Sequence, residues 1–114
     1  MIGRLHYERD FKNLRINGKT AKRGFLSVVF SPSDSSSGGI RVAFAVGRSV
    51  GGAVVRNRIK RRLREALAKM ITKNKLVPNG DYLIRVFPEA KNKTFICLAE
   101  NLENVIEDLR KDHG

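Results

Sequence analysis

The sequence predicts an α+β fold in which amphipathic helices pack against a small sheet. Three observations lead to this prediction. Residues 40–46 alternate between large apolar side chains and others, which is typical of a strand with one buried face. Residues 53–73 and 94–110 repeat apolar side chains every three or four positions, which is typical of helices with one buried side. A further strand at 81–87 would complete a strand–helix–strand unit.

The first third of the chain predicts one helix and one strand. Residues 8–17 predict a short helix, because acidic residues occupy its first turn and Gly18 follows as a stop signal. The apolar run at residues 25–30 predicts the first main strand. Residues 31–39 are rich in serine and glycine, so we expect a flexible loop there.

Two turns, at residues 47–52 and 78–80, are expected to frame the long central helix. In the last helix, residues 94–110, one side carries the apolar residues and the other sides carry acidic ones. We expect the apolar side to pack in the core and the acidic sides to face water. The chain has no internal repeat and no linker, so residues 1–114 are predicted to form a single domain.

The charge of the chain is its most informative property. It has 23 Lys and Arg residues against 11 Asp and Glu, a net charge of +12. The excess is confined to residues 1–75, where we count 18 basic and 4 acidic residues. Such a domain repels itself unless it meets a polyanion. A membrane surface is disfavoured as the partner, because no bulky apolar residues accompany the basic ones and no apolar run approaches the ~20 residues of a membrane span.

The cysteine content and the N-terminal sequence predict a cytoplasmic protein. Cys97 is the only cysteine, so the chain has no internal disulfide, and we expect this side chain to be buried on the apolar helix. The first ten residues are charged and lack the apolar stretch of a secretory signal.

No set of catalytic residues is visible, and we expect no metal-binding residue in the protein itself. The two histidines, His6 and His113, lie near the chain ends. Asp10, Asp34 and Asp81 are better explained as residues of a helix start, a loop and a turn. A nuclease that works alone should show a carboxylate cluster or a histidine pair, and neither appears.

The central helix carries six basic residues among the nine at positions 56–64. At ~100° per residue, one side is apolar and should pack on the sheet: Val55, Ile59, Leu63, Ala66, Leu67 and Met70. A polar stripe falls nearly opposite: Asn57, Lys60, Arg61 and Arg64. Arg58 and Arg62 form a second row beside that stripe.

Nucleic-acid binding explains this basic face better than solvation does. Only Glu65 offers a nearby acidic partner, and unpaired like charges at this density destabilise a helix. Arginine, which predominates, suits phosphate and base edges better than lysine. The predicted RNA-binding residues are Arg48, Arg56, Asn57, Arg58, Lys60, Arg61, Arg62 and Arg64.

The run from Val46 to Ala66 (VGRSVGGAVVRNRIKRRLREA) closely resembles the signature of the bacterial ribonuclease P protein subunit. The marks are a Gly-Gly-Ala-Val turn and an Arg-Asn-Arg motif that opens a basic helix. Asp10-Phe11 resembles the first-helix motif of that family. The other predicted elements follow in the family's order, so the resemblance extends over nearly the whole chain.

The resemblance implies an αβββαβα two-layer sandwich with a left-handed βαβ crossover, against the usual right-handed rule. It also implies assembly with the catalytic RNA of ribonuclease P, which removes the 5′ leader of precursor tRNA. In that family the RNA and its bound Mg²⁺ carry out the hydrolysis. The protein would thus need no catalytic residue, no metal site and no obligate protein partner.

The family's leader-binding cleft lies between the first helix and the sheet. Carried over to this chain, it would comprise Phe11, Arg15, Leu26, Val28, Phe30, Arg41 and Ala45. Arg15 and Val28 stand where many members have an aromatic residue, so the stacking surface would be either reduced or shifted to Phe30, with Arg15 stacking or pairing instead. Core packing is an equally good explanation of Phe11 and Phe30. We also expect the polar stripe of the central helix to border this open sheet face.

Two other functions are compatible with parts of the sequence. A ribosomal or other structural RNA-binding protein could share the fold and the charge. A DNA-binding protein is possible on charge alone, although no helix-turn-helix or zinc-binding pattern is present.

Overall fold

The computed structural model describes residues 2–5, 8–32, 39–73 and 77–113. His6 and Asp34 lie outside this set, as does the side chain of His113. In the described part, five strands form one sheet: β1 (Ile2–Arg4), β2 (Lys19–Arg23), β3 (Leu26–Pro32), β4 (Ile40–Val46) and β5 (Gly80–Val86). The helices are α1 (Glu8–Asn17), α2 (Ala53–Thr72), the short 3₁₀ helix η1 (Pro88–Asn92) and α3 (Phe95–His113).

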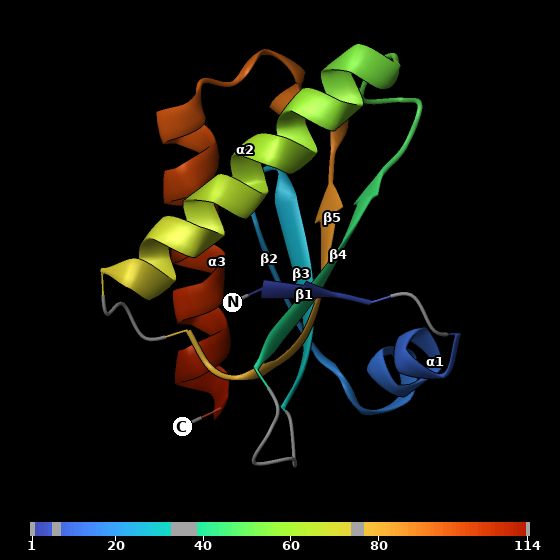
Figure 1. Cartoon of the computed structure of the whole chain (residues 1–114), viewed down its shortest axis with the longest axis vertical. Coiled ribbons are helices and arrows are strands. Elements are labelled where there is room, and N and C mark those ends of the chain that lie inside the picture. Colours follow the sequence, from blue (N-terminus) through green and yellow to red (C-terminus); the bar gives the residue numbers. More distant parts are fainter. Residues whose placement is uncertain (1, 6–7, 33–38, 74–76, 114) are drawn as a thin grey trace.

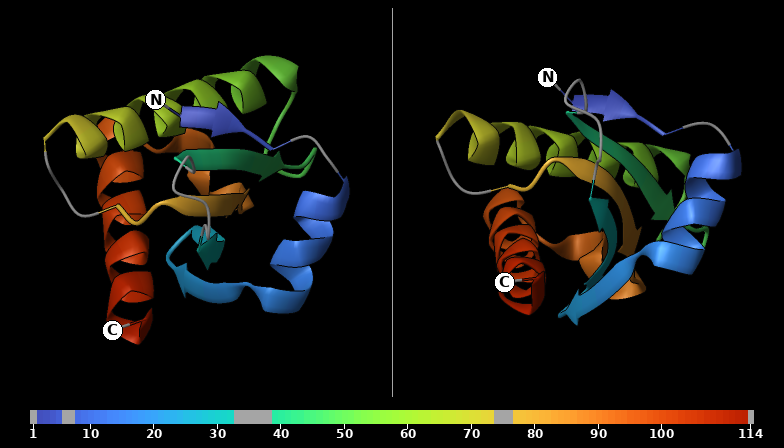
Figure 2. Two further views of the ribbon diagram at one scale, coloured as in Figure 1. Left: turned by 60° about the horizontal axis from the view of Figure 1, so that its bottom comes forward. Right: turned by 90° about the horizontal axis from the view of Figure 1, so that it is seen from below.

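The sheet is mixed, with the strand order β1-β4-β5-β3-β2 (Figure 1). Strand β4 runs parallel to β1 and β5, whereas β3 is antiparallel to both β5 and β2. Helices α2 and α3 pack on one face of the sheet, and α1 lies on the other (Figure 2). The connection from β4 through α2 to β5 is the left-handed crossover that the family resemblance implied. The predicted α+β fold is confirmed.

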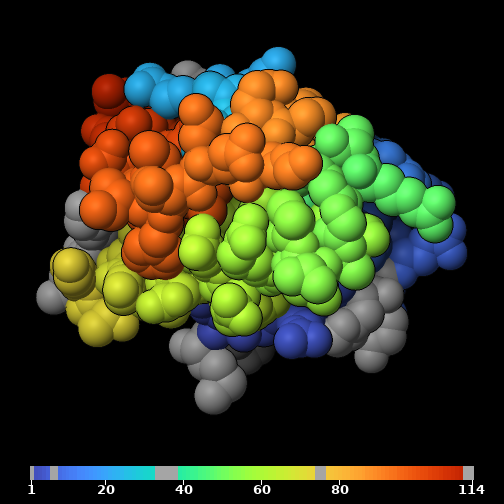
Figure 3. Space-filling model, turned by 90° about the horizontal axis from the view of Figure 1, so that it is seen from above, coloured from blue at the N-terminus to red at the C-terminus, as the bar shows by residue number. Residues whose placement is uncertain are grey.

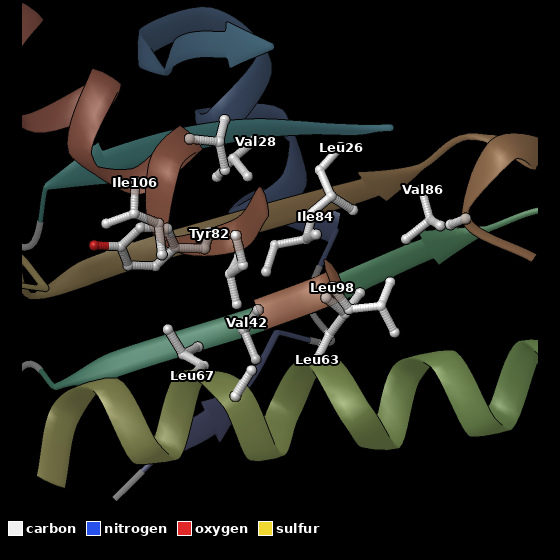
Figure 4. Close-up of a cluster of buried hydrophobic side chains, with 14 of the residues drawn as sticks. Leu26, Val28, Val42, Leu63, Leu67, Tyr82, Ile84, Val86, Leu98 and Ile106 are labelled. Carbon is white, nitrogen blue, oxygen red and sulfur yellow. The ribbon is translucent and has the colours of Figure 1, made fainter. Parts of the chain in front are cut away.

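The core lies between the sheet and the pair α2 and α3. Its strand residues alternate along each strand, and its helix residues form the predicted apolar sides (Figure 4). On the sheet side the core contains Leu26, Val28, Phe30, Val42, Tyr82, Ile84 and Val86. The rings of Phe30 and Tyr82 lie 4.8 Å apart between centroids, and burial raises the pKa of Tyr82. Core packing therefore accounts for Phe30.

Strand β2 ends at a turn that α3 holds in place. Asn101 of α3 donates a hydrogen bond to the carbonyl of Arg23 at 2.7 Å and accepts one from the amide of Phe25 at 3.3 Å. Arg23 also forms an ion pair with Asp108 at 2.9 Å. Gly24 has a φ of 58°, a left-handed conformation that favours glycine. Helix α3 thus holds this turn through hydrogen bonds to its backbone and through an ion pair with the Arg23 side chain.

Three local features differ from the expectations. The residue pattern did not predict β1 or β2 as strands, because β1 has three residues and β2 buries only Ala21. Both are edge strands, and edge strands often carry charged residues rather than an apolar alternation. Cys97 is exposed, so the expectation that it lies in the core is wrong; it falls outside the apolar side of α3.

Candidate nucleic-acid interface

Helix α2 is anchored by the predicted apolar side. Ile59, Leu63, Ala66, Leu67 and Met70 are buried, and Val55 is partly buried against the same core. The basic residues are therefore held on a rigid helix, and the space-filling view shows α2 exposed along the surface beside the β4–α2 turn (Figure 3).

One flank of α2 forms a groove with the edge of the sheet. Asn57, Lys60, Arg61 and Arg64 line a hollow of about 450 Å³, together with Arg4, Val42 and Phe44. The Arg64 guanidinium lies 5.5 Å from the centre of the Phe44 ring. The expectation that this stripe lies nearly opposite the core is wrong for Lys60 and Arg64, which are half-buried beside β4. The stripe borders the core-side edge of β4, and of its residues only Lys60 also lines a hollow that reaches Ala45 and Arg85 on the open face of the sheet.

Positive charges crowd this hollow. Burial and, secondarily, the nearby charge of Arg4 lower the pKa of Arg64. An anion placed between the two arginines would relieve their repulsion. The geometry therefore favours a phosphate group at this site.

The second row carries arginines on the other flank of α2. Arg58 and Arg62 are half-buried on this flank, and Arg56, which lies on the Lys60 side of the helix, is half-buried as well. The Nε atoms of Arg56 and Arg58 are buried without a hydrogen-bond partner among the described residues. Arg48 is exposed in the turn that follows β4. None of the eight predicted RNA-binding side chains forms an ion pair with another described residue, and Glu65 pairs instead with Lys69 at 3.6 Å. These cations remain available to an external anion.

The face of the sheet that carries α1 is organised in three rows that cross the strands. The compensated row, nearest the start of α1, consists of Gly3, Arg41, Asp81 and Ser31. The middle row consists of Ala43, Leu83, Val29 and Thr20. The basic row, farthest from the compensated row, consists of Ala45, Arg85, Ser27 and Lys22.

The strand face assigned to β3 in the predicted cleft is wrong. Leu26, Val28 and Phe30 lie on the core face and are buried, whereas Ser27, Val29 and Ser31 face α1. Apolar residues occur on both faces of β3, so its sequence did not distinguish them. A shift by one residue moves every side chain to the opposite face.

The other four cleft residues lie on the α1 side or on α1 itself. Ala45 is exposed in the basic row, and Arg15 is exposed on α1. Phe11 is half-buried one helical turn before Arg15. Arg41 lies on the expected face, but two carboxylates hold it: Asp81 at 2.8 Å and Asp10 at 3.3 Å. The hydrogen bond from Arg41 to Asp81, more than any other interaction, raises the pKa of Arg41.

A continuous groove connects the open sheet face with α2. A hollow of about 410 Å³ lies between α1 and the sheet and is lined by Leu14, Arg15, Gly18, Thr20, Ser27, Val29, Leu83 and Arg85. A second hollow, of about 590 Å³, lies at the ends of β4 and β5 and shares Leu83 and Arg85 with the first. The second hollow also shares Phe44 and Lys60 with the groove beside α2.

Sequence reasoning missed Arg4 and Arg85, which line this groove, and Lys22, which lies beside it over the Phe87 ring. Their strand register was the missing information: Lys22 and Arg85 share a row only because both pair with Ser27. Isolated basic residues in short strands carry no sequence signal comparable to the run on α2.

Two general features of the described residues bear on the class of protein. No described helix is long and apolar enough to cross a membrane. The described part of the chain also contains no group of three or more His, Cys, Asp or Glu residues arranged to hold a metal ion.

Comparisons with known proteins agree on one family. The family model for ribonuclease P matches residues 3–110. The chain is 36% identical over 104 residues to the ribonuclease P protein component of Acidothermus cellulolyticus, covering 90% of this chain and 84% of that protein. It is 38% identical over 104 residues to the component of Thermus scotoductus, covering 91% of this chain but only 56% of that protein. The chain therefore spans little more than half of the Thermus relative.

Solved structures show the same fold. The ribonuclease P protein of Staphylococcus aureus superposes with a TM-score of 0.79 at 23% identity, covering 93% of this chain and 94% of that one. The protein from Thermotoga maritima gives a TM-score of 0.78 at 24% identity, covering 92% and 96%. At these identities the structural likeness establishes the overall architecture alone.

Proposed function

Because this chain belongs to the ribonuclease P protein family, we propose that it is the protein subunit of a ribonucleoprotein that removes the 5′ leader from precursor tRNA. It would act in the cytoplasm, bound to the catalytic RNA of that enzyme. The observation that carries the proposal is the groove that runs from α1, around the ends of β4 and β5, to the basic flank of α2.

The groove suits a single-stranded RNA better than a duplex. Its floor on the open sheet face combines apolar side chains, such as Leu83 and Val29, with the cation Arg85. Single strands offer both base faces and phosphates, so their binding sites pair such surfaces with positive charge. In the proposal the leader occupies this part of the groove.

The arginines of α2 would bind the catalytic RNA. Arg58 and Arg62 lie on the flank of α2 away from the groove, so a second RNA segment can reach them while the leader is bound. Folded RNA presents phosphates in fixed positions. A rigid helix can match them, because it holds its arginines at fixed spacings.

Hydrolysis in this proposal is the work of the RNA and its Mg²⁺ ions. The nearest carboxylate pair on the open face, Asp10 and Asp81, is occupied by Arg41 and is therefore poorly suited to hold a metal ion. The protein contributes positive charge near the substrate, which reduces the repulsion between leader and catalytic RNA and lowers the Mg²⁺ concentration that assembly requires.

Reconstitution tests the proposal. The purified protein is mixed with a bacterial ribonuclease P RNA, and leader removal from precursor tRNA is followed at low Mg²⁺. We expect no cleavage by the protein alone and restored cleavage by the mixture. Metal-dependent cleavage by nuclease-free, RNA-free protein would contradict it. A ribosomal or other structural RNA-binding role would instead give RNA binding without any stimulation of cleavage.

A further inference from the structure

We infer that the phosphates of a single-stranded RNA cross the open sheet face along the basic row, with Arg85 as the central binding residue, and that Arg41 takes no part in binding them. This inference rests on the proposed function and refines it. It distinguishes between two arginines that lie on the same face of neighbouring parallel strands.

The two arginines have opposite electrostatic surroundings. Arg41 is held between Asp10 and Asp81, so the three side chains together carry a net negative charge. Arg85 is exposed and forms no hydrogen bond or ion pair with any residue that the structure describes. A phosphate near Arg41 would meet two carboxylates, whereas a phosphate near Arg85 meets an uncompensated cation.

The register explains why Arg85 is accessible. Its neighbours across the sheet are Ser27 on β3 and Ala45 on β4, both of which are small. Because these neighbours are small, the long arginine side chain extends beyond them and can reach a ligand on either side. Arg85 also lines both hollows of the open face, the one beside α1 and the one at the strand ends.

Further cations extend the row in both directions. Lys22 lies two strands away, at about 10 Å if neighbouring strands are ~4.8 Å apart. Its ammonium group is 4.7 Å from the centre of the Phe87 ring, which keeps the charge beside the groove. On the other side, Lys60 of α2 shares the hollow at the strand ends with Arg85. The path from Lys22 through Arg85 to Lys60 therefore runs across the strands.

Helix α1 leaves this path open. Its contacts with the sheet involve the other two rows: Asp10 binds Arg41, and Asn13 donates a hydrogen bond to Ser31 at 3.2 Å. Leu14 is buried, and Gly18 lies against Val29 of the middle row. The bases of a bound strand would lie over the middle row, beside α1, while the phosphates follow the basic row.

The test measures binding of a fluorescein-labelled oligoadenylate by anisotropy across a salt series. The variants are Arg85→Gln, Arg85→Lys and Lys22→Gln. Lys19→Gln is the matched control, because Lys19 is an exposed cation on the same strand as Lys22 but faces the opposite side of the sheet. Circular dichroism melting of each variant verifies the fold.

Arg85→Gln is expected to weaken binding roughly tenfold at low salt and to reduce the slope of log affinity against log salt by ~0.7, the value for one phosphate contact on a single strand. Arg85→Lys should retain most of the slope, and Lys19→Gln should change affinity less than about twofold. Arg41→Gln, measured at a temperature at which it is folded, should match the Lys19 control in slope.

Equal effects of Arg85→Gln and Lys19→Gln would overturn the inference, as would a loss of slope in Arg41→Gln as large as that in Arg85→Gln. Failure of the unmodified protein to bind the oligoadenylate would also overturn it. Reconstituted leader removal is measured independently, so failure of the inference can be told apart from failure of the proposed function.

Discussion

Single side chains help to hold the edge of the sheet formed by β2 and β3, and Asn101 is the clearest case. Its amide group satisfies both a carbonyl and an amide of the turn between β2 and β3. The neighbouring glycine has a positive φ, so the turn itself cannot shift easily to find other partners. Loss of this side chain leaves two backbone groups without a partner from the protein.

We expect Asn101→Ala to lower the free energy of unfolding by about 1–3 kcal/mol, because partly buried polar groups lose their hydrogen bonds. Urea denaturation followed by circular dichroism measures the change. Asn104→Ala is the control, since Asn104 lies exposed on the same helix. If both variants are equally stable, the bonds to the turn contribute nothing to the fold.

Phe11 tests whether α1 contributes a stacking surface. Stacking of a base on an aromatic side chain is worth ~1–3 kcal/mol by alanine substitution. Phe11→Ala should therefore weaken binding of precursor tRNA and leave binding of mature tRNA nearly unchanged, as measured by competition binding with the reconstituted enzyme. A purely structural role of this half-buried ring predicts lost thermal stability instead, with no difference between the two RNAs.

The residue scale is also where prediction from sequence was weakest. Val28 and Val29 are chemically alike, and only the register of β3 places the first in the core and the second under α1. Likewise, the compensation of Arg41 depends on Asp10 and Asp81, which are 31 and 40 residues away along the chain. Long-range pairing of this kind leaves no local pattern.

At the scale of elements, α2 was predictable because its two properties are both local. The apolar side follows from a period of 3.6 residues, and six of the nine residues at positions 56–64 are basic. The short strands β1 and β2 were not predictable from the residue pattern, since their stability comes from pairing with β4 and β3 rather than from their own residues.

The second row of α2 yields a prediction about assembly. Arg58→Ala and Arg62→Ala should each weaken binding of the catalytic RNA by about tenfold, because a charge-assisted hydrogen bond to phosphate is lost. The free energy of unfolding should change by less than about 1 kcal/mol, since both residues lie off the buried side of the helix. Filter binding and thermal melting provide the two measurements.

Lys111→Ala serves as the control for these variants. It removes one positive charge from α3, at a position whose ion pair with Glu107 is long, 4.0 Å, and exposed. A large drop in the melting temperature of Arg58→Ala or Arg62→Ala, with unchanged RNA affinity of the folded protein, would show that this row stabilises the fold instead.

At the scale of the whole molecule, basic and acidic residues are concentrated on different elements. The groove and both flanks of α2 carry the uncompensated cations, whereas the acidic residues of α3 lie at the far side of the core and partly pair with basic neighbours. The sequence predicted this separation, because the excess of basic residues lies in the first 75 positions. It did not predict that the cations form one path around the end of β4, which depends on the order of the strands.

This arrangement predicts that RNA binding is mainly electrostatic. If a single-stranded leader contacts about five phosphate-binding side chains along the groove, log affinity should fall with log salt at a slope of roughly −3.5, from ~0.7 per contact. Anisotropy titrations of the labelled oligoadenylate between low and moderate salt give the slope. Sulfate and chloride series at matched ionic strength separate general screening from specific anion competition, because a doubly charged anion should compete at Arg85 and in the hollow beside Arg64. A flat salt response would mean that apolar contacts, such as those of the middle row, dominate the interface, and the groove would then need another explanation.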